Sequence, residues 1–171
     1  MRLVETLARR RVTLGFLAGA VVLWQAHPTR MTLLIGVAVA GFGEAFRFWA
    51  AGHLNKAREV TSSGPYGWCA HPLYVGSSVM GIGLAIASGS LLVAGLIVAY
   101  LAVTLTAAIR GEEAFLRGKF GQGYDVYRQG AQRDDARRFS FAQAMANREH
   151  RAVAGLVLAA LLLALRASRG V

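Results

Sequence analysis

The chain has 171 residues, which is enough for a single domain spanning residues 1–171. Hydrophobic residues make up 55% of it and the mean hydropathy is +0.43, more apolar surface than a soluble domain of this length can bury. The formal net charge of +10 does not indicate a nucleic-acid partner, because the Lys and Arg residues gather between long apolar runs instead of forming one basic face.

Five apolar segments predict an all-α integral membrane protein with about five transmembrane helices. They cover residues 12–27, 31–51, 73–87, 91–109 and 152–165. The first and the last are short for a full crossing, so we expect tilt or snorkelling at their ends. The first follows a basic cluster, as a signal peptide does. However, no convincing small-residue cleavage site follows it and the next span begins almost at once, which favours a retained helix.

The third and fourth spans are separated only by residues 88–90, which predicts a tight antiparallel helical hairpin. Lys and Arg are concentrated in the N-terminal segment, in the loop after the second span and in residues 110–151. Five spans place these three regions on the same side of the membrane. The positive-inside rule therefore predicts a cytoplasmic N-terminus and an external C-terminus, in what we expect to be a bacterial cytoplasmic membrane.

Small residues recur at four-residue steps in two spans, a pattern that lets helices approach closely in lipid. They are Gly15 and Gly19 in the first span, and Ser77, Gly81, Ala85 and Gly89 along the third. A single broad polar stripe is missing from the spans, which argues against a channel. The one cysteine, Cys69, excludes both a disulfide within the chain and a cysteine-rich zinc site.

Polar residues gather at the predicted inner boundary of the membrane. At the end of the second span, Glu44 and Arg47 share a helix face, where they form either a structural ion pair or part of a functional site. Before the third span, Pro72 suits the first helical turn and keeps His71 extended. His71 then lies beside free backbone N–H groups that can bind an anion, although a simple helix cap is the alternative.

A third polar place is the pair Glu112 and Glu113, which directly follows the fourth span. Negative charge is unfavourable at the C-terminal end of a helix, so this pair requires an explanation. Neighbouring helical residues point about 100° apart, so we expect one carboxylate to face the bundle, where it can hold an ammonium or a sulfonium, and the other to face water. The alternative is a solvated pair at the interface.

The predicted hairpin begins and ends on the inner face, so it should bring His71 close to Glu112 and Glu113. Aromatic and apolar residues follow this pair at nearly helical spacing and predict an amphipathic helix lying along the membrane surface. These residues are Leu116, Phe120, Tyr124 and Tyr127. An imidazole and an acid that converge beside tyrosines make a plausible site for an amphiphile.

The pattern as a whole resembles the isoprenylcysteine carboxyl methyltransferase and phospholipid methyltransferase superfamily, over about residues 47–165. The matching residues are Gly64-Pro65-Tyr66, then His71-Pro72-Leu73-Tyr74-Val75-Gly76, then Glu112-Glu113 with Leu116, Phe120-Gly121, and Tyr124 with Tyr127. Residues 47–56 and 147–151 are similar to the bacterial members. The specific part is the His-Pro-x-Tyr-x-Gly motif followed, at the right distance, by the Glu-Glu pair.

The resemblance implies an S-adenosylmethionine pocket on the cytosolic side and a lipid or prenylated amphiphile as the methyl acceptor. The acceptor is either a prenylcysteine-type carboxylate, which needs no general base, or a phospholipid-type amine, whose proton a carboxylate can take. By position, the cofactor-binding candidates are His71, Pro72, Leu73, Tyr74, Gly76, Glu112, Glu113, Tyr124 and Tyr127. The catalytic candidates are Glu112, Glu113 and Arg47.

Two positions depart from the family pattern. Members usually carry arginine immediately before the His-Pro pair, where this chain has Ala70, and Gly67 replaces a commonly basic or polar residue. Losing a fixed positive charge weakens the binding of a cofactor carboxylate or of an anionic acceptor. Arg47 and Arg110 are candidates to supply it. These two departures affect the expected substrate class more than the expected fold.

Other interpretations stay open beside the methyltransferase. An integral-membrane reductase of related architecture would bind a nicotinamide cofactor, and it would not need a glycine-rich fingerprint. A non-catalytic family member stays open because of Ala70. A metal site formed by His53, His71 and Glu112 or Glu113 is the least supported, because no tight metal-binding motif is present. No pattern identifies the methyl acceptor or the oligomeric state.

Overall fold

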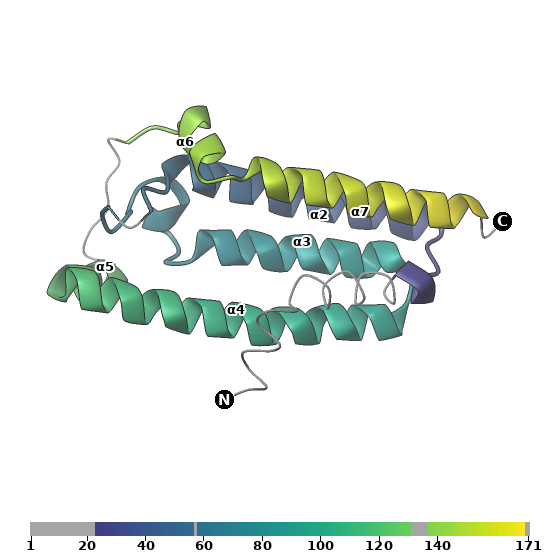
Figure 1. Ribbon diagram of the computed structural model, residues 1–171, viewed down its shortest axis with the longest axis horizontal. Coiled ribbons are helices and arrows are strands. Elements are labelled where there is room, and N and C mark those ends of the chain that lie inside the picture. The colour runs from purple at the N-terminus through teal and green to yellow at the C-terminus, as the bar shows by residue number, and fades with distance from the viewer. Residues whose placement is uncertain (1–22, 57, 131–136, 170–171) are drawn as a thin grey trace, which may run out of the picture.

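The structure is a computed structural model, and it describes residues 23–56, 58–130 and 137–169. All regular structure in these ranges is helical, as predicted. The elements are α2 (Arg30–His53), η1 (Gly64–Gly67), α3 (Pro72–Ser88), α4 (Leu91–Phe120), α5 (Gln122–Arg128), α6 (Phe141–Ala146) and α7 (His150–Arg169). The four long helices run alongside one another, with α3 between α2 and α4 and with α7 against α2 (Figure 1). The short elements η1, α5 and α6 gather at one end of this bundle (Figure 1).

Among the described residues, three helices are long and apolar enough to cross a membrane, namely α2, α4 and α7. The shorter apolar helix α3 has 17 residues. At 1.5 Å per residue it is about 25 Å long, somewhat less than the ~30 Å of a hydrocarbon core. Each of the last four predicted spans is therefore a helix. The predicted first span and its Gly15–Gly19 pair lie outside the described residues, apart from the last residues of that span.

Helix α4 extends well beyond the predicted fourth span, which ended near Ile109, because it continues to Phe120. Hydropathy falls at Arg110, but Glu, Ala, Leu and Arg are good helix formers and carry the helix onward. Glu112 and Glu113 therefore lie inside a helix, and the prediction that they follow its end was wrong. With 30 residues the helix is about 45 Å long, so its last turns project beyond the membrane core.

The surface helix predicted from aromatic spacing is divided differently in the structure. Leu116 and Phe120 belong to the end of α4, whereas Tyr124 and Tyr127 lie on the seven-residue α5. The break is at Gly121, whose φ of 53° is in the left-handed region that favours glycine. The chain changes direction there, so that both tyrosines turn back toward the bundle and are buried.

The turn between α3 and α4 forms the predicted tight hairpin. Helix α3 ends at Gly89 in the left-handed conformation, and α4 begins at the N-cap Ser90, whose hydroxyl accepts a hydrogen bond from the N–H of Val93. The hairpin is antiparallel, so the start of α3 and the end of α4 lie at the same end of the molecule (Figure 1). This is the end that carries η1, α5 and α6.

Helices α2 and α3 pack with their backbones in close contact. A Cβ atom added to Gly36 or Gly43 of α2, or to Gly83 of α3, would collide with backbone atoms of the other helix. Such contacts are typical of helix association in lipid. The small residues predicted to form one stripe on α3 contact two different helices: Gly81 faces Leu101 of α4, and Ser77 faces α2.

Candidate active site

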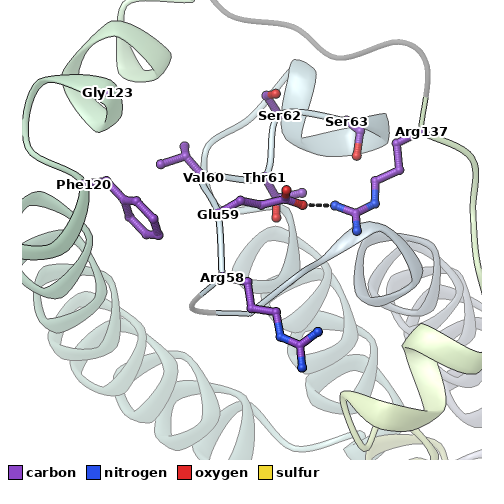
Figure 2. Close-up of a pocket in the computed structure, with 9 residues that line it drawn as sticks. All are labelled: Arg58, Glu59, Val60, Thr61, Ser62, Ser63, Phe120, Gly123 and Arg137. Atoms are coloured by element: carbon purple, nitrogen blue, oxygen red, sulfur yellow. Dashed lines mark hydrogen bonds and ion pairs between the residues drawn. The ribbon is translucent and has the colours of Figure 1, made fainter.

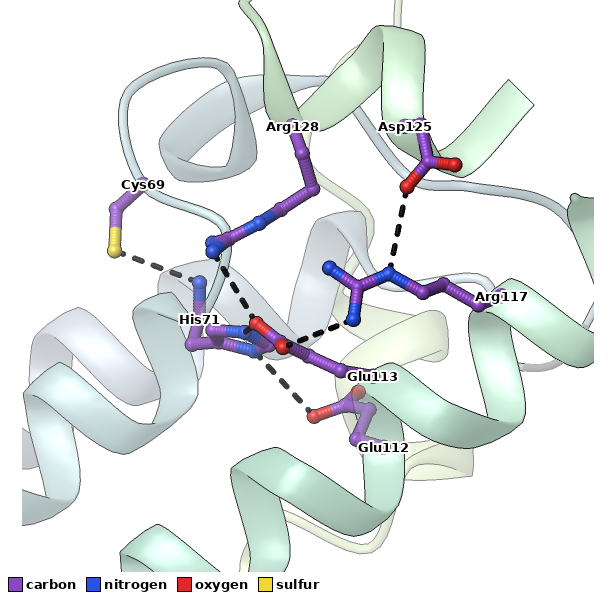
Figure 3. Close-up of polar contacts among 7 residues, drawn as sticks. All are labelled: Cys69, His71, Glu112, Glu113, Arg117, Asp125 and Arg128. Carbon is purple, nitrogen blue, oxygen red and sulfur yellow. Dashed lines mark hydrogen bonds and ion pairs between the residues drawn. The ribbon is translucent and has the colours of Figure 1, made fainter. Parts of the chain in front are cut away.

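The imidazole of His71 lies between the two carboxylates of the Glu-Glu pair (Figure 3). Its Nε2 atom is 3.2 Å from Oε1 of Glu113, and its Nδ1 atom is 3.6 Å from Oε2 of Glu112. His71 is the residue at the N-cap of α3, and Pro72 occupies the first helical turn. The hairpin therefore brings together residues about 40 positions apart in sequence, as the pattern of spans predicted.

This arrangement favours the charged form of the imidazole. The contact with Glu112 raises the pKa of His71 above its ordinary value, and the hydrogen bond with Glu113 adds to this, although burial acts in the opposite direction. Because an imidazole ordinarily titrates just below neutral pH, a larger fraction of His71 is protonated at pH 7 than in a free histidine.

The two glutamates have different surroundings. Glu112 lines a cavity, whereas Glu113 does not. Oε1 of Glu113 lies 3.3 Å from a guanidinium nitrogen of Arg128, and its Oε2 lies 3.8 Å from one of Arg117 (Figure 3). The expectation of one inward-facing carboxylate is thus met by Glu112. Glu113 faces α5 rather than open water, and it ties α5 to α4 and to His71.

The cavity has a volume of about 390 Å³, which is in the range of small-molecule sites. It is enclosed by the loop after α2, η1, the start of α3, the last turns of α4, and α5. Its walls are mainly apolar and aromatic, with a few charged groups. The lining residues are Leu54, Lys56, Glu59, Val60, Thr61, Tyr66, Ala70, His71, Leu73, Tyr74, Glu112, Phe115, Leu116, Tyr124 and Tyr127.

Three tyrosines close one side of the cavity. The hydroxyl of Tyr127 donates a hydrogen bond of 2.8 Å to the carbonyl oxygen of Tyr66, which fixes α5 against η1. Burial raises the pKa of all three phenols, Tyr66, Tyr124 and Tyr127, so they stay neutral. The buried Tyr124 hydroxyl has no hydrogen-bond partner in the described part of the chain. An unsatisfied buried hydroxyl is costly, and it often marks a group that binds a ligand or water.

The structure places the predicted site residues in two groups. Those that line the cavity are His71, Leu73, Tyr74, Glu112, Tyr124 and Tyr127. Those that lie outside its lining are Pro72, Gly76, Glu113 and Arg47. Pro72 is buried in the first turn of α3. Gly76 gives room to Arg47, because a Cβ atom there would collide with that side chain and with the backbone of α2.

Arg47 belongs to a buried charge cluster between α2 and the start of α7. Its Nε atom lies 2.7 Å from Oε1 of Glu149 and 3.5 Å from Oε2 of Glu44, and it also donates a hydrogen bond to Ser77. The predicted pairing with Glu44 is confirmed, but the closer partner is Glu149. Neither Arg47 nor Arg110 is among the residues that line the cavity beside Ala70.

Several cavity residues were not predicted as site residues from the sequence. Lys56, Glu59 and Thr61 come from the irregular loop after α2, where no periodicity signals an orientation, and Phe115 comes from the unpredicted extension of α4. The one sequence signal for Lys56 was the similarity of residues 47–56 to bacterial members of the superfamily. That segment ends at Lys56.

A second, more polar hollow lies beside the first (Figure 2). It has a volume of about 460 Å³ and shares Glu59, Val60 and Thr61 with the first cavity. Glu59 accepts a hydrogen bond from Arg137 across it (Figure 2). The other lining residues are Arg58, Ser62, Ser63, Phe120 and Gly123.

The three-ligand metal site considered from the sequence is not assembled. In residues 23–56, 58–130 and 137–169, no group of three or more His, Cys, Asp or Glu side chains is placed to hold a metal ion. His53 instead lies at the end of α2, where its Nδ1 atom is 3.3 Å from the hydroxyl of Ser63 and its ring meets Trp49 edge to face.

Comparison with family models assigns the chain to a family. The model of a family described as phospholipid methyltransferase matches residues 12–123, well over half of the chain. The match contains His71, Glu112 and Glu113, and it ends just before Tyr124. No solved structure matches the chain significantly.

Two curated proteins are similar to part of the chain. The nickel-cobalt-cadmium resistance protein NccN of Alcaligenes xylosoxydans xylosoxydans is 33% identical over 96 residues, which are 55% of this chain and 43% of that protein. The cobalt-zinc-cadmium resistance protein CzcN of Cupriavidus metallidurans is 35% identical over 96 residues, 54% of this chain and 43% of that protein. The matched region is thus less than half the length of either relative.

Proposed function

The chain belongs to the phospholipid methyltransferase family, and from this we propose that it transfers the methyl group of S-adenosylmethionine to a lipid-like acceptor in the membrane. The observation that carries the proposal is the cavity in which His71 and Glu112 face each other beside buried tyrosines. The cavity lies at the end of the bundle that also carries Arg117, Arg128 and Arg137, which belong to the large basic group predicted in residues 110–151. We propose that this end is cytoplasmic.

The lining of the cavity fits S-adenosylmethionine chemically. Glu112 offers an acceptor for an ammonium or a nearby sulfonium, and the tyrosines with Phe115 and Leu116 offer flat apolar walls for a purine. The unpartnered hydroxyl of Tyr124 is available to a polar group of a bound molecule. The volume of about 390 Å³ is suitable for a ligand of this size.

Bound S-adenosylmethionine would supply an electrophilic methyl group: the acceptor would bond to the methyl carbon in line as the C–S bond breaks, and the thioether S-adenosylhomocysteine would be the leaving group. The contribution of the chain is to align the reacting groups and exclude water. His71 holds the carboxylate of Glu112 in place, and Glu113 holds both His71 and α5. In this way the wall that carries Tyr124 and Tyr127 is fixed relative to Glu112.

The class of acceptor decides whether a base is needed. A carboxylate acceptor reacts without proton transfer, whereas an amine acceptor must lose a proton to a nearby carboxylate. The cavity wall carries two carboxylates, Glu59 and Glu112, so either class is compatible with the site.

The proposal is tested with the purified protein and S-adenosylmethionine labelled in the methyl group, incubated with a membrane lipid extract. We expect label in the lipid fraction and, by mass spectrometry, lipids heavier by one methylene. His71→Ala and Glu112→Ala should lose both cofactor binding and transfer. Unchanged binding in both variants would refute the site assignment. Binding of nicotinamide nucleotides in place of S-adenosylmethionine would instead favour the membrane reductase.

The names of the two relatives refer to resistance to nickel, cobalt, zinc and cadmium. We infer no metal-binding function from these names, because the shared region is less than half of each relative. Methylation of membrane lipids in cells with and without this chain is the informative comparison, and it should be made with and without added metal.

A further inference from the structure

The charged groups on the cavity wall come from two different elements. Glu112 belongs to α4, whereas Lys56 and Glu59 belong to the loop after α2. Lys56 is close enough to Glu112 for their charges to interact. A cationic and an anionic side chain therefore face the same space from separate parts of the chain.

Three arginines near the cavity are engaged with acids. Arg117 and Arg128 both pair with Glu113, and Arg137 pairs with Glu59. The Glu59 carboxylate is thereby also neutralised. These pairs leave the cavity with the Glu112 carboxylate, the His71 imidazole and the Lys56 ammonium as its remaining charged groups.

Lys56 differs from these arginines in its contacts. Its side chain is exposed, and it forms no hydrogen bond or ion pair with residues 23–55, 58–130 or 137–169. An ammonium on a long flexible stem at the mouth of a cavity is able to bind an anionic group that enters. Ala70 lines the same cavity, so the position at which the family pattern has arginine brings no charge to it here.

We propose that Lys56 binds the α-carboxylate of the methyl donor, while Glu112 binds its α-ammonium. The two groups are attached to one carbon atom of the donor, so a cation and an anion that face the same space form a matching receptor. This inference rests on the function proposed above and names a further binding residue of that site. Lys56 positions the donor and does not take part in the displacement.

The test compares two ligands that differ only in the carboxylate, S-adenosylmethionine and decarboxylated S-adenosylmethionine. Their dissociation constants are measured by isothermal titration calorimetry with the purified full chain in detergent. We expect the wild type to prefer the carboxylated ligand. Lys56→Ala should weaken binding of that ligand about tenfold, the size of one lost charge-assisted hydrogen bond at a partly exposed site. Its affinity for the decarboxylated ligand should not change.

Two further variants separate a specific contact from a general effect of charge. Arg58→Ala removes the same charge two residues further along the loop, where the side chain lines the neighbouring polar hollow (Figure 2). It should change neither dissociation constant by more than about twofold, the effect of a screened charge that makes no contact. Lys56→Arg should retain the preference for the carboxylated ligand.

The outcomes distinguish this inference from the proposed function. An equal loss of affinity for both ligands in Lys56→Ala would overturn the role of Lys56, as would a similar loss in Arg58→Ala. A wild type that binds both ligands equally well would also overturn it, but would leave the methyltransferase proposal standing. A wild type that binds neither ligand would overturn the proposed function itself.

Discussion

Glu112 and Glu113 are adjacent in sequence but have different surroundings, so the same substitution can be compared at both positions. Glu112→Gln and Glu113→Gln each remove one negative charge and keep the shape of the side chain. In the structure Glu112 faces the cavity, whereas Glu113 faces His71, Arg117 and Arg128. The first change should therefore act on ligand binding, and the second on how firmly α5 is attached.

The expected magnitudes follow from these contacts. A hydrogen bond to a charged group contributes about 1.5–3 kcal/mol, and the Glu112 side chain is 38% exposed, so the lower end of this range applies. Glu112→Gln should then weaken S-adenosylmethionine binding roughly tenfold to thirtyfold. Glu113→Gln loses two arginine pairs, and the arginine side chains are 53% and 41% exposed. At about 0.2–1 kcal/mol each, their loss should lower the free energy of unfolding by about 1 kcal/mol.

Two measurements separate the variants. Isothermal titration calorimetry gives the dissociation constant of S-adenosylmethionine, and thermal unfolding in the same detergent gives the stability. We expect Glu112→Gln to change mainly the first and Glu113→Gln mainly the second. Equal loss of binding in both variants would show that facing the cavity does not distinguish the two glutamates. A larger loss of binding in Glu113→Gln would refute the reasoning outright.

Three other predictions concern the bundle and its protonation. Because its contacts raise the pKa of His71, the stabilisation from this residue should be complete below about pH 6.5 and should decline as the pH rises through the higher folded-state value. A thermal midpoint whose pH dependence is unchanged in His71→Gln would contradict this. Arg47→Ala leaves the buried Glu149 without its partner, so it should lower the free energy of unfolding, measured by denaturation, by about 3–5 kcal/mol. An effect on catalysis without this loss of stability would argue instead for a role at the active site. Gly83→Ala should destabilise the protein by about 1–3 kcal/mol, because the backbone of α2 leaves no room for the added methyl group. Its control, Gly95→Ala, lies on an open face of α4 and should be neutral or stabilising. Equal thermal midpoints for the two variants would show that α2 and α3 are not in close contact.

The central feature of the site could be predicted because it depends on local signals. A turn at Gly89 and Ser90 joins α3 to α4, and two helices joined by such a tight turn begin and end at the same membrane face. That is sufficient to bring His71 to Glu112 and Glu113. The length of α4 could not be read from hydropathy, since its last turns are polar but still favour a helix.

The contacts that were missed join segments that are distant in the sequence. Arg47 and Glu149 are 102 residues apart, and no periodicity relates a residue in α2 to one just before α7. Only the local partner Glu44, three residues away on the same helix, could be predicted. Lys56 lies in an irregular loop, where the direction of a side chain depends on tertiary packing.

The projecting end of α4 sets the height of the cavity relative to the membrane-spanning part of the helix, independently of the lipid. The helix is continuous from Leu91 to Phe120, so the distance along it from Leu91 to Glu112 is fixed by the protein. The depth of a lipid acceptor is fixed by its acyl chains. A thicker bilayer cannot easily take in Arg110, since drawing a charged group into hydrocarbon is unfavourable. In the proposed methyl transfer, the length of the surrounding acyl chains would thus control how often a lipid acceptor reaches the cavity.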